Sequence, residues 1–411
     1  MYSEVLNSVN PDIMMREFGR QKTFILILLA VLLGSSSLIN LGSSEFPLDP
    51  TILRLRYLLV STSLLLFIGI SRSNKWRLDS KAVPLILVWT LFSFVLVISG
   101  LANNDSTSVR DGFWFMIGIP FIFFYTLPKL MEKSANQLIA IALLIGHVPY
   151  IVVSLCLYPI TPSPYKGVFA NPNQMGFTGA TIAAAVFILL IAALSTKNSL
   201  LYISFLILLL TSSLIIILVA NSRTSLIAFF SMFLILLFQL IYNPNYLFKF
   251  LSIITTASTA FVLLFSQQLH LIWNNIVVGV ITKNENSDGI SGRGEIWIDV
   301  LNNINLLGHG TEYIESHFNL GGHNTLIDVV ARYGMIAGYL LLFLTITSLL
   351  YSYFYFKNYA KNDPYTIAPL VITVCFWVLS MGEGMFGSLG NAMTLAYTLS
   401  IGVILIKPNM E

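Results

Sequence analysis

The sequence has few charged residues and only two cysteines. Charged residues make up 10% of its 411 positions and hydrophobic residues 56%, whereas a soluble globular domain has about 25% charged residues. A water-soluble fold of this length could not bury that much apolar surface. Cys156 and Cys375 both lie inside apolar runs, where a cysteine acts as a small hydrophobe, so neither a disulfide framework nor a thiolate metal site is indicated.

The sequence has no strong net charge, and its first residues do not resemble a cleaved signal peptide. The formal net charge of +3 is small and gives no reason to expect a nucleic-acid partner. Residues 1–22 are polar and place the first apolar run too far from the start for a cleaved signal peptide. We therefore expect the first helix to remain in the mature protein.

Apolar runs long enough to span a membrane as helices fill most of the chain. They predict an all-α, polytopic integral membrane protein of about twelve transmembrane helices, folded as a single membrane domain over residues 1–411. The predicted spans are residues 23–41, 53–70, 82–101, 113–127, 138–158, 175–194, 200–220, 225–241, 247–265, 335–356, 366–381 and 392–406.

The distribution of charge predicts how these helices are oriented. If both termini are cytoplasmic, about two thirds of the 22 Lys and Arg residues lie inside and about two thirds of the 19 acidic residues lie outside, an asymmetry that the positive-inside rule favours. The one long polar segment, residues 266–333, is then an extracytoplasmic loop inserted before the last three helices. We therefore expect any chemistry on the outer face.

Arg223 is the first candidate for a binding residue. In the segment NSRTSL it lies between two apolar runs, at the outer ends of two predicted helices. A cation at the membrane boundary costs free energy unless it snorkels to water, pairs, or meets an anionic ligand. No acidic residue lies near it in the sequence, so both a ligand-binding arginine and a snorkelling arginine at a helix end stay open.

Arg293 is the second candidate, in the segment ISGRGEIW. It lies between Gly292 and Gly294, where the backbone can approach a ligand closely, and its guanidinium can bind phosphate oxygens in bidentate fashion. If residues 295–302 are helical, Trp297 shares its face. An arginine beside an aromatic ring can hold a phosphorylated sugar, although a tryptophan at a membrane boundary is more often an interface anchor.

His323 is the candidate for a general base. It follows two glycines and precedes Asn324 and Thr325, which suit the start of a helix. A histidine in this setting can take a proton from a substrate, because neutral imidazole is abundant near pH 7. His309 and His317 lie in the same loop, so position alone does not separate His323 from a surface histidine without a task.

Metal chemistry and transport have weaker support. The residues that could ligate a metal by type are His309, Glu312, His317, His323 and Asp328. No HExxH or paired-carboxylate motif accompanies them, and we expect neither a metal nor a cofactor. A transporter is expected to carry ionisable residues or broken helices at midplane. His147, near Pro149, is the only ionisable residue deep in an apolar run, which weakens the transporter interpretation without excluding it.

Three elements around the long loop resemble, in this order, the O-antigen ligase and polymerase superfamily of bacterial envelope glycan assembly. They are SRTSL at a helix junction, GRGEIW followed by LLGHG, and GGHNTLIDVVARYGMIAG leading into the next apolar run. The segment VFANPNQMGF is similar to the asparagine-containing outer loop of that family. The motifs cover residues 167–339, and the helix count and the long loop extend the resemblance to the whole chain.

The resemblance implies a metal-independent, inverting glycosyltransferase that takes its glycan from a polyprenyl-pyrophosphate carrier at the outer face of the bacterial cytoplasmic membrane. By similarity, Arg223 and Arg293 bind the donor pyrophosphate, and His323 deprotonates the acceptor hydroxyl. Two arginines can stabilise a departing pyrophosphate, and a histidine can raise the nucleophilicity of a sugar hydroxyl. No nucleotide-sugar site is needed on that face.

Members of this family differ in their acceptor. Ligases place the glycan on lipid A-core, polymerases join repeat units, and related members glycosylate proteins. The sequence HNT in this chain departs from the HNE associated with ligases, which favours an O-antigen or exopolysaccharide polymerase with a chain-length regulator as a further partner. The alternatives are an O-antigen ligase and a flippase of lipid-linked oligosaccharides, which would share the topology but not need the histidine.

Overall fold

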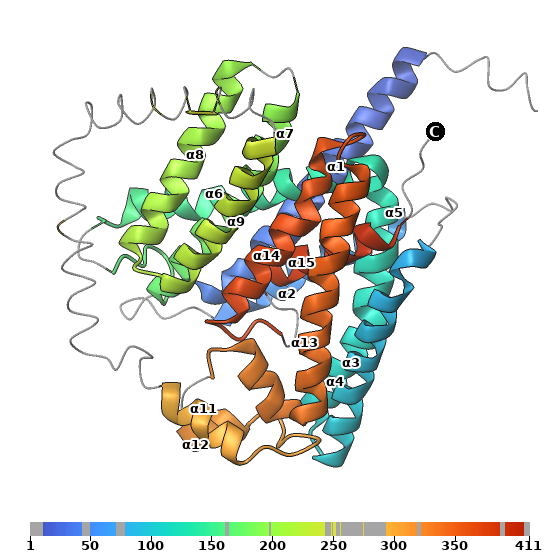
Figure 1. Cartoon of the computed structure of the whole chain (residues 1–411), viewed down its shortest axis with the longest axis vertical. Helices are drawn as coiled ribbons and strands as arrows, with labels where there is room; N and C mark the ends of the chain where they lie inside the picture. Colours follow the sequence, from blue (N-terminus) through green and yellow to red (C-terminus); the bar gives the residue numbers. More distant parts are fainter. Residues whose placement is uncertain are drawn as a thin grey trace, which may run out of the picture.

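The computed structural model describes residues 11–42, 50–70, 79–160, 164–196, 199–242, 293–318, 322–386 and 391–406, with residues 248, 250, 251, 255 and 274 (Figure 1). Over these ranges the fold is all-helical, and β-type pairing is confined to one bridge between Leu41 and Phe169. The helices are α1 (Pro11–Ser36), α2 (Pro50–Ile70), α3 (Val83–Ala102), α4 (Ser106–Phe113), α5 (Leu127–Met131), α6 (Ala135–Leu157), α7 (Pro172–Ser195), α8 (Leu200–Val219), α9 (Arg223–Tyr242), α11 (Arg293–Asn302), α12 (Tyr313–Phe318), α13 (Thr325–Tyr359), α14 (Ala368–Ser380) and α15 (Ala392–Leu405).

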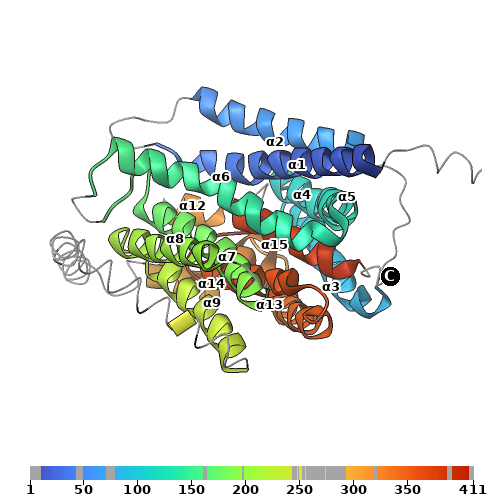
Figure 2. The same cartoon turned by 90° about the horizontal axis from the view of Figure 1, so that it is seen from above.

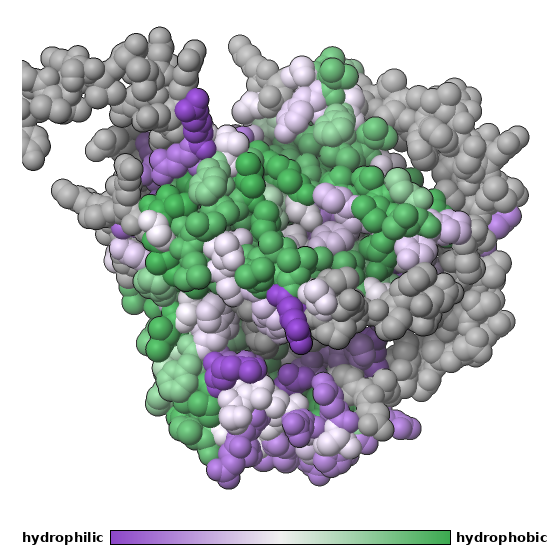
Figure 3. All heavy atoms as spheres, turned by 180° about the vertical axis from the view of Figure 1, so that it is seen from behind, coloured by the Kyte–Doolittle hydropathy of each residue, from purple (hydrophilic) through white to green (hydrophobic). Residues whose placement is uncertain are grey.

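Long apolar helices make the chain a multi-pass membrane protein. Within the described ranges, 7 helical stretches are long and apolar enough to cross a membrane. Large apolar side chains such as Leu65 and Leu201 face outward, 68% and 82% exposed, as expected of a surface that contacts lipid. Figure 3 shows this apolar cover over much of the described surface, with polar residues gathered at the end that carries α11 and α12 in Figure 1.

Most predicted spans correspond to helices, but among the described residues 7 stretches qualify as membrane spans against the twelve predicted: α2 is not one of them, and α14 and α15 are shorter apolar helices. Three further differences follow. The spans predicted at 113–127 and 138–158 lie in one helical stretch, Ser106–Leu157, in which π-helical turns follow α4. The span predicted to begin at residue 335 belongs to a helix that begins at Thr325, because Asn324 caps it by accepting from two backbone N–H groups. The span predicted at 247–265 lies outside the described ranges, apart from isolated residues.

Helix α7 is the centre of the bundle. Its most apolar stretch is entirely buried, and the helix packs against α6, α8, α9 and α14 (Figure 2). A run of small residues, Ala183 to Ala185, is fully buried and lets neighbouring helices approach closely. The side chain of Asn171 accepts a hydrogen bond from Asn173 N, and Pro172 follows as the first helical residue, a combination that starts a helix. The rigid α7 therefore fixes the position of Asn173 at one end of the bundle.

Two glycines, Gly308 and Gly334, allow the chain that follows α11 to cross the beginning of α13 in close backbone contact. Gly334 lies inside α13 with φ 90° and ψ 177°, a conformation essentially restricted to glycine, and kinks the helix there. A Cβ at Gly334 would collide with the backbone of Leu306 and Gly308, and one at Gly308 would collide with α13 in return. Beside this crossing, Met335 N donates to Asn305 O at 2.9 Å. The glycine crossing therefore fixes the direction of the first turns of α13.

Asp105 ties the turn between α3 and α4 to the chain before α12. Its Oδ1 accepts from Thr107 N at 2.9 Å and caps α4, and its Oδ2 accepts from Ser108 Oγ and from Thr311 N, each at 2.7 Å. Burial raises the pKa of Asp105, but the hydrogen bonds from Ser108 and Thr311 outweigh burial and lower the pKa from 3.8 to about 2. The folded protein thus favours the charged form of this carboxyl group.

We expect Asp105 to make the protein lose stability in acid. A carboxyl group whose pKa is lower in the folded state contributes stability above its ordinary pKa and loses it as the pH falls towards the folded value. Between about pH 4 and pH 2, the melting temperature of the wild type in detergent should therefore fall further than that of Asp105→Asn, which has no charge to lose. Equal losses in the two proteins would contradict this role.

Candidate functional site

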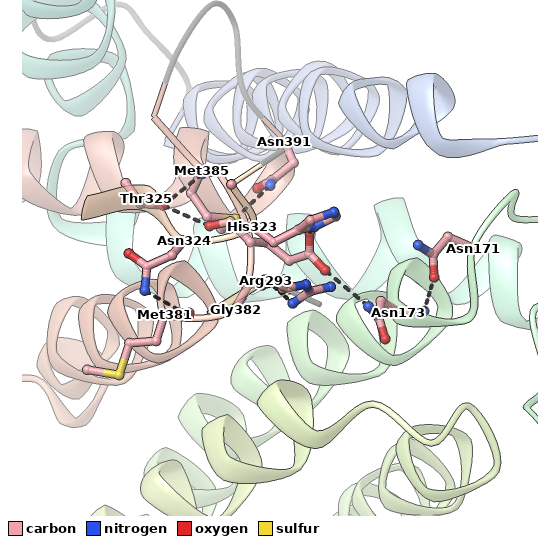
Figure 4. Close-up of polar contacts among 12 residues, drawn as sticks. Asn171, Asn173, Arg293, His323, Asn324, Thr325, Met381, Gly382, Met385 and Asn391 are labelled. Atoms are coloured by element: carbon pink, nitrogen blue, oxygen red, sulfur yellow. Dashed lines mark hydrogen bonds and ion pairs between the residues drawn. The ribbon is translucent and has the colours of Figure 1, made fainter. Parts of the chain in front are cut away.

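The connection between α14 and α15, residues 381–386, lies at the centre of the candidate site. It is bound to the start of α13, because Thr325 Oγ1 donates to Glu383 O and accepts from Met385 N, each at 2.8 Å (Figure 4). At its end, Phe386 is buried in an aromatic cluster. The rings that surround it are those of Trp89, Phe92, Phe115, Phe376, Trp377 and Tyr397. This anchoring gives the connection a fixed position between the helices.

His323 faces this connection from the residue before the cap of α13. Its φ is 48°, a left-handed conformation that costs a non-glycine residue about 1 kcal/mol and persists where the surrounding structure enforces it. Its Nδ1 lies 3.1 Å from Glu383 Oε2, and the two side chains are 29% and 19% exposed. If the ring is neutral, a carboxylate partner favours the tautomer with the proton on Nδ1, because a carboxylate only accepts hydrogen bonds, and this tautomer leaves Nε2 able to accept another.

Glu383 is also bound by Asn173, near the start of α7. Its other carboxylate oxygen, Oε1, accepts from Asn173 Nδ2 at 3.3 Å (Figure 4). Gly384, the next residue, lies against the carboxylate of Asp328, and a Cβ at Gly384 would collide with that carboxylate. The side chain of Glu383 therefore spans from the start of α7 to the start of α13, with His323 on one of its oxygens and Asn173 on the other.

Arg293 reaches the same connection as the first residue of α11. Its guanidinium donates to Gly382 O at 3.4 Å (Figure 4). The helix predicted at residues 295–302 is confirmed, since α11 covers Arg293–Asn302. The indole N–H of Trp297 donates to Gly322 O at 3.0 Å, so this ring supports the backbone immediately before His323.

Arg223 begins α9 and is exposed. The next residue, Thr224, packs against Gly382, where an added Cβ would collide with the Thr224 hydroxyl. On the other side, Ser222 packs against Gly176 of α7 in the same way. These two close contacts set the α8–α9 junction against the connection and against α7.

Two of the three predicted site residues contact adjacent residues of one connection, and the third is the sequence neighbour of another residue that contacts it. Arg293 donates to the carbonyl group of Gly382, His323 binds the carboxylate of Glu383, and Thr224, the neighbour of Arg223, packs on Gly382. Arginine cations near a histidine that can act as a base suit a ligand that carries an anionic leaving group beside a hydroxyl.

The other histidines have different surroundings. His309 and His317 stack on Tyr313, with ring centroids 4.4 and 4.6 Å away. His147 is buried and lies 3.1 Å from Ser37 Oγ, which joins α6 to α1. In the part of the chain that the structure describes, no group of three or more His, Cys, Asp and Glu side chains could hold a metal ion.

Glu383 belongs to none of the motifs that predicted the other site residues. In the printed sequence it is the only carboxylate of the glycine-rich stretch MGEGMFGSLGN, between two apolar runs. A carboxylate at a membrane boundary is costly without a partner, and that signal could have marked it. Asn173 was included in a matching motif, but its partner Glu383 lies 210 positions away, and no local pattern connects the two.

Comparisons with known proteins do not assign the chain to a family. No model of a known protein family matches the sequence, and no curated protein matches it.

Proposed function

We propose that the protein is a glycosyltransferase that uses a polyprenyl-pyrophosphate-linked glycan as its donor, most specifically a polymerase of O-antigen or exopolysaccharide repeat units. The observation that carries the proposal is that Arg293 and His323 contact the adjacent residues Gly382 and Glu383, while Thr224, the neighbour of Arg223, packs on the same Gly382. These residues come from three separate segments of the chain. The resemblance of their motifs to the O-antigen ligase and polymerase superfamily supplies the donor class.

In the proposed reaction, His323 Nε2 takes the proton from a hydroxyl group of the acceptor sugar. The oxygen of that hydroxyl attacks the anomeric carbon of the donor from the face opposite the pyrophosphate and forms the new glycosidic bond. The bond from the anomeric carbon to the pyrophosphate oxygen breaks, and polyprenyl pyrophosphate departs with the electron pair. Arg223 and Arg293 stabilise the negative charge that develops on that oxygen, and the imidazolium returns its proton to water.

The proposal also includes a helix count and an orientation in the membrane, in addition to the multi-pass fold. We propose about twelve transmembrane helices with both termini in the cytoplasm, in a bacterial inner membrane. Residues 266–333 then form an extracytoplasmic loop, and the site faces outward. Support comes from the starts of α7, α9 and α13 and the end of α14, which gather at one end of the bundle where the site residues lie.

The experiment that tests the function is reconstitution of the purified protein in liposomes with a polyprenyl-pyrophosphate-linked oligosaccharide. Products in which repeat units are joined to each other support the polymerase. Transfer only to added lipid A-core would replace the polymerase with the ligase. Movement of the donor across the bilayer with no new glycosidic bond for any acceptor would overturn the proposal in favour of a flippase.

Lysine at either arginine position is expected to reduce transfer. Arg223→Lys and Arg293→Lys keep the positive charge but lose the planar fork that binds two phosphate oxygens together. Each should lower the rate of transfer by about tenfold or more, the equivalent of one lost charge-assisted hydrogen bond of about 1.5 kcal/mol.

Arg54→Lys is the matched control for these two substitutions. Arg54 is exposed near the start of α2 and serves as an interfacial arginine in the proposal, so its replacement should leave the rate unchanged while all three variants accumulate in the membrane. Wild-type rates in both Arg223→Lys and Arg293→Lys would remove these residues from the donor site.

A further inference from the structure

The contacts of Glu383 extend the proposed mechanism beyond the residues that the motifs contain. Its carboxylate binds the Nδ1 side of His323 at 3.1 Å and accepts from Asn173 at 3.3 Å. Its backbone carbonyl group accepts from Thr325 at 2.8 Å. Two hydrogen bonds therefore hold the partly buried carboxylate and a third holds the backbone of Glu383, and the titratable side chain that is hydrogen-bonded to the carboxylate is the imidazole of His323.

We infer that Glu383 is a positioning residue that keeps the proton of neutral His323 on Nδ1 and so leaves Nε2 free to accept the proton of the acceptor hydroxyl. This inference rests on the proposed glycosyl transfer. The tautomer of a histidine is set by the hydrogen bond that its other nitrogen makes. A histidine with the proton on Nε2 would present a donor to the hydroxyl group and could not act as its base.

Glu383 also stabilises the state that follows proton transfer. When Nε2 takes the proton, His323 becomes a cation, and Oε2 of Glu383 is the hydrogen-bonded anion beside it. The charge-assisted hydrogen bond strengthens as this positive charge appears. The Asn173 amide, held at the start of α7, keeps the carboxylate from turning away. Asn173 therefore acts on the base through Glu383.

The first measurement needs no turnover. The protein has 5 histidines, so ¹⁵N spectra of histidine-labelled protein in detergent can be assigned by the signal that His323→Asn removes. At a pH where the ring is neutral, we expect Nδ1 of wild-type His323 to carry the proton and Glu383→Gln to redistribute it towards Nε2. A wild-type proton on Nε2, or the same Nδ1 tautomer in Glu383→Gln, would overturn the inference.

The second measurement separates a positioning role from a general structural one. Glu383→Gln should lower kcat about ten- to a hundredfold while KM for the lipid-linked donor stays the same, because both arginines remain. Combined with His323→Ala, it should cause no further loss, since Glu383 acts only through the histidine. The inference would be contradicted if the double variant lost kcat by the product of the two separate effects. It would also be contradicted if Glu383→Gln changed KM alone.

Asp299→Asn is the matched control. Asp299 is a partly buried carboxylate of α11 that accepts from Tyr313 Oη at 2.9 Å, and the structure gives it no contact with His323. Its replacement should leave kcat and the tautomer of His323 unchanged. If the wild type forms no glycosidic bond at all, the proposed function fails, whereas the tautomer measurement still shows whether Glu383 positions the ring.

Discussion

Replacement of His323 by alanine is expected to slow transfer from a lipid-linked donor about a hundred- to ten-thousandfold, the range that loss of a general base causes. The acceptor hydroxyl is a poor nucleophile while it keeps its proton, and His323 is the base that the proposed reaction assigns to it. Donor binding should survive because the arginines are unchanged. The measurement is turnover of a purified lipid-linked glycan in liposomes.

A second variant and a chelator make this result specific. His323→Asn keeps a residue that tolerates the left-handed conformation, so the same loss of rate in a protein of wild-type melting temperature assigns the effect to the missing base. A chelator should leave the wild-type rate unchanged, because the mechanism uses no metal. Near-normal turnover in both variants would remove His323 from the reaction.

Replacement of Gly334 by alanine is expected to destabilise the fold by about 3 kcal/mol or more. The added Cβ would meet the backbone atoms of Leu306 and Gly308, which cannot move aside as a flexible side chain can. The backbone conformation of Gly334 is also strained for any residue with a side chain. The measurement is the melting temperature in detergent together with the amount of protein in the membrane.

Gly69→Ala is the control for Gly334→Ala. Gly69 lies in α2 with nothing within 4 Å of its ideal Cβ position, and alanine favours a helix over glycine by up to about 1 kcal/mol. Its melting temperature should be unchanged or raised. Equal behaviour of the two alanine variants would show that the crossing at Gly334 is not tightly packed.

Local features of the fold could be predicted from the sequence, and features made by distant contacts could not. The apolar run predicted at 200–220 corresponds to α8 at Leu200–Val219, because a helix that faces lipid must be apolar over its whole length. The start of α13 followed from Asn324 and Thr325, since capping involves only neighbouring residues. The kink at Gly334 depends on the chain at residues 305–308, which crosses it, and no pattern around Gly334 records that crossing.

The same distinction applies to the candidate site. The resemblance of the motifs marked Arg223, Arg293 and His323, whereas their local settings left open a snorkelling arginine and a surface histidine without a task. Sequence position could not separate His323 from His309, which the structure does through the contact with Glu383 and the stack on Tyr313. Glu383 itself lies 60 positions from His323, and that pairing exists only in the folded chain.

The lengths of the helices around the connection bear on where the site lies along the bundle. Helix α7, whose Asn173 binds Glu383, has 24 residues and at 1.5 Å rise each is about 36 Å long, enough to cross a hydrocarbon core about 30 Å thick. The far end of α15 meets the polar start of α3, where Asp79 N donates to Leu405 O at 2.9 Å.

In the proposed reaction, the connection that carries Glu383 then lies at the membrane boundary, level with the starts of α7, α9 and α13. The polyprenyl chain of the donor would stay among the lipid tails while its pyrophosphate meets the arginines, so the carrier would not have to leave the bilayer for transfer.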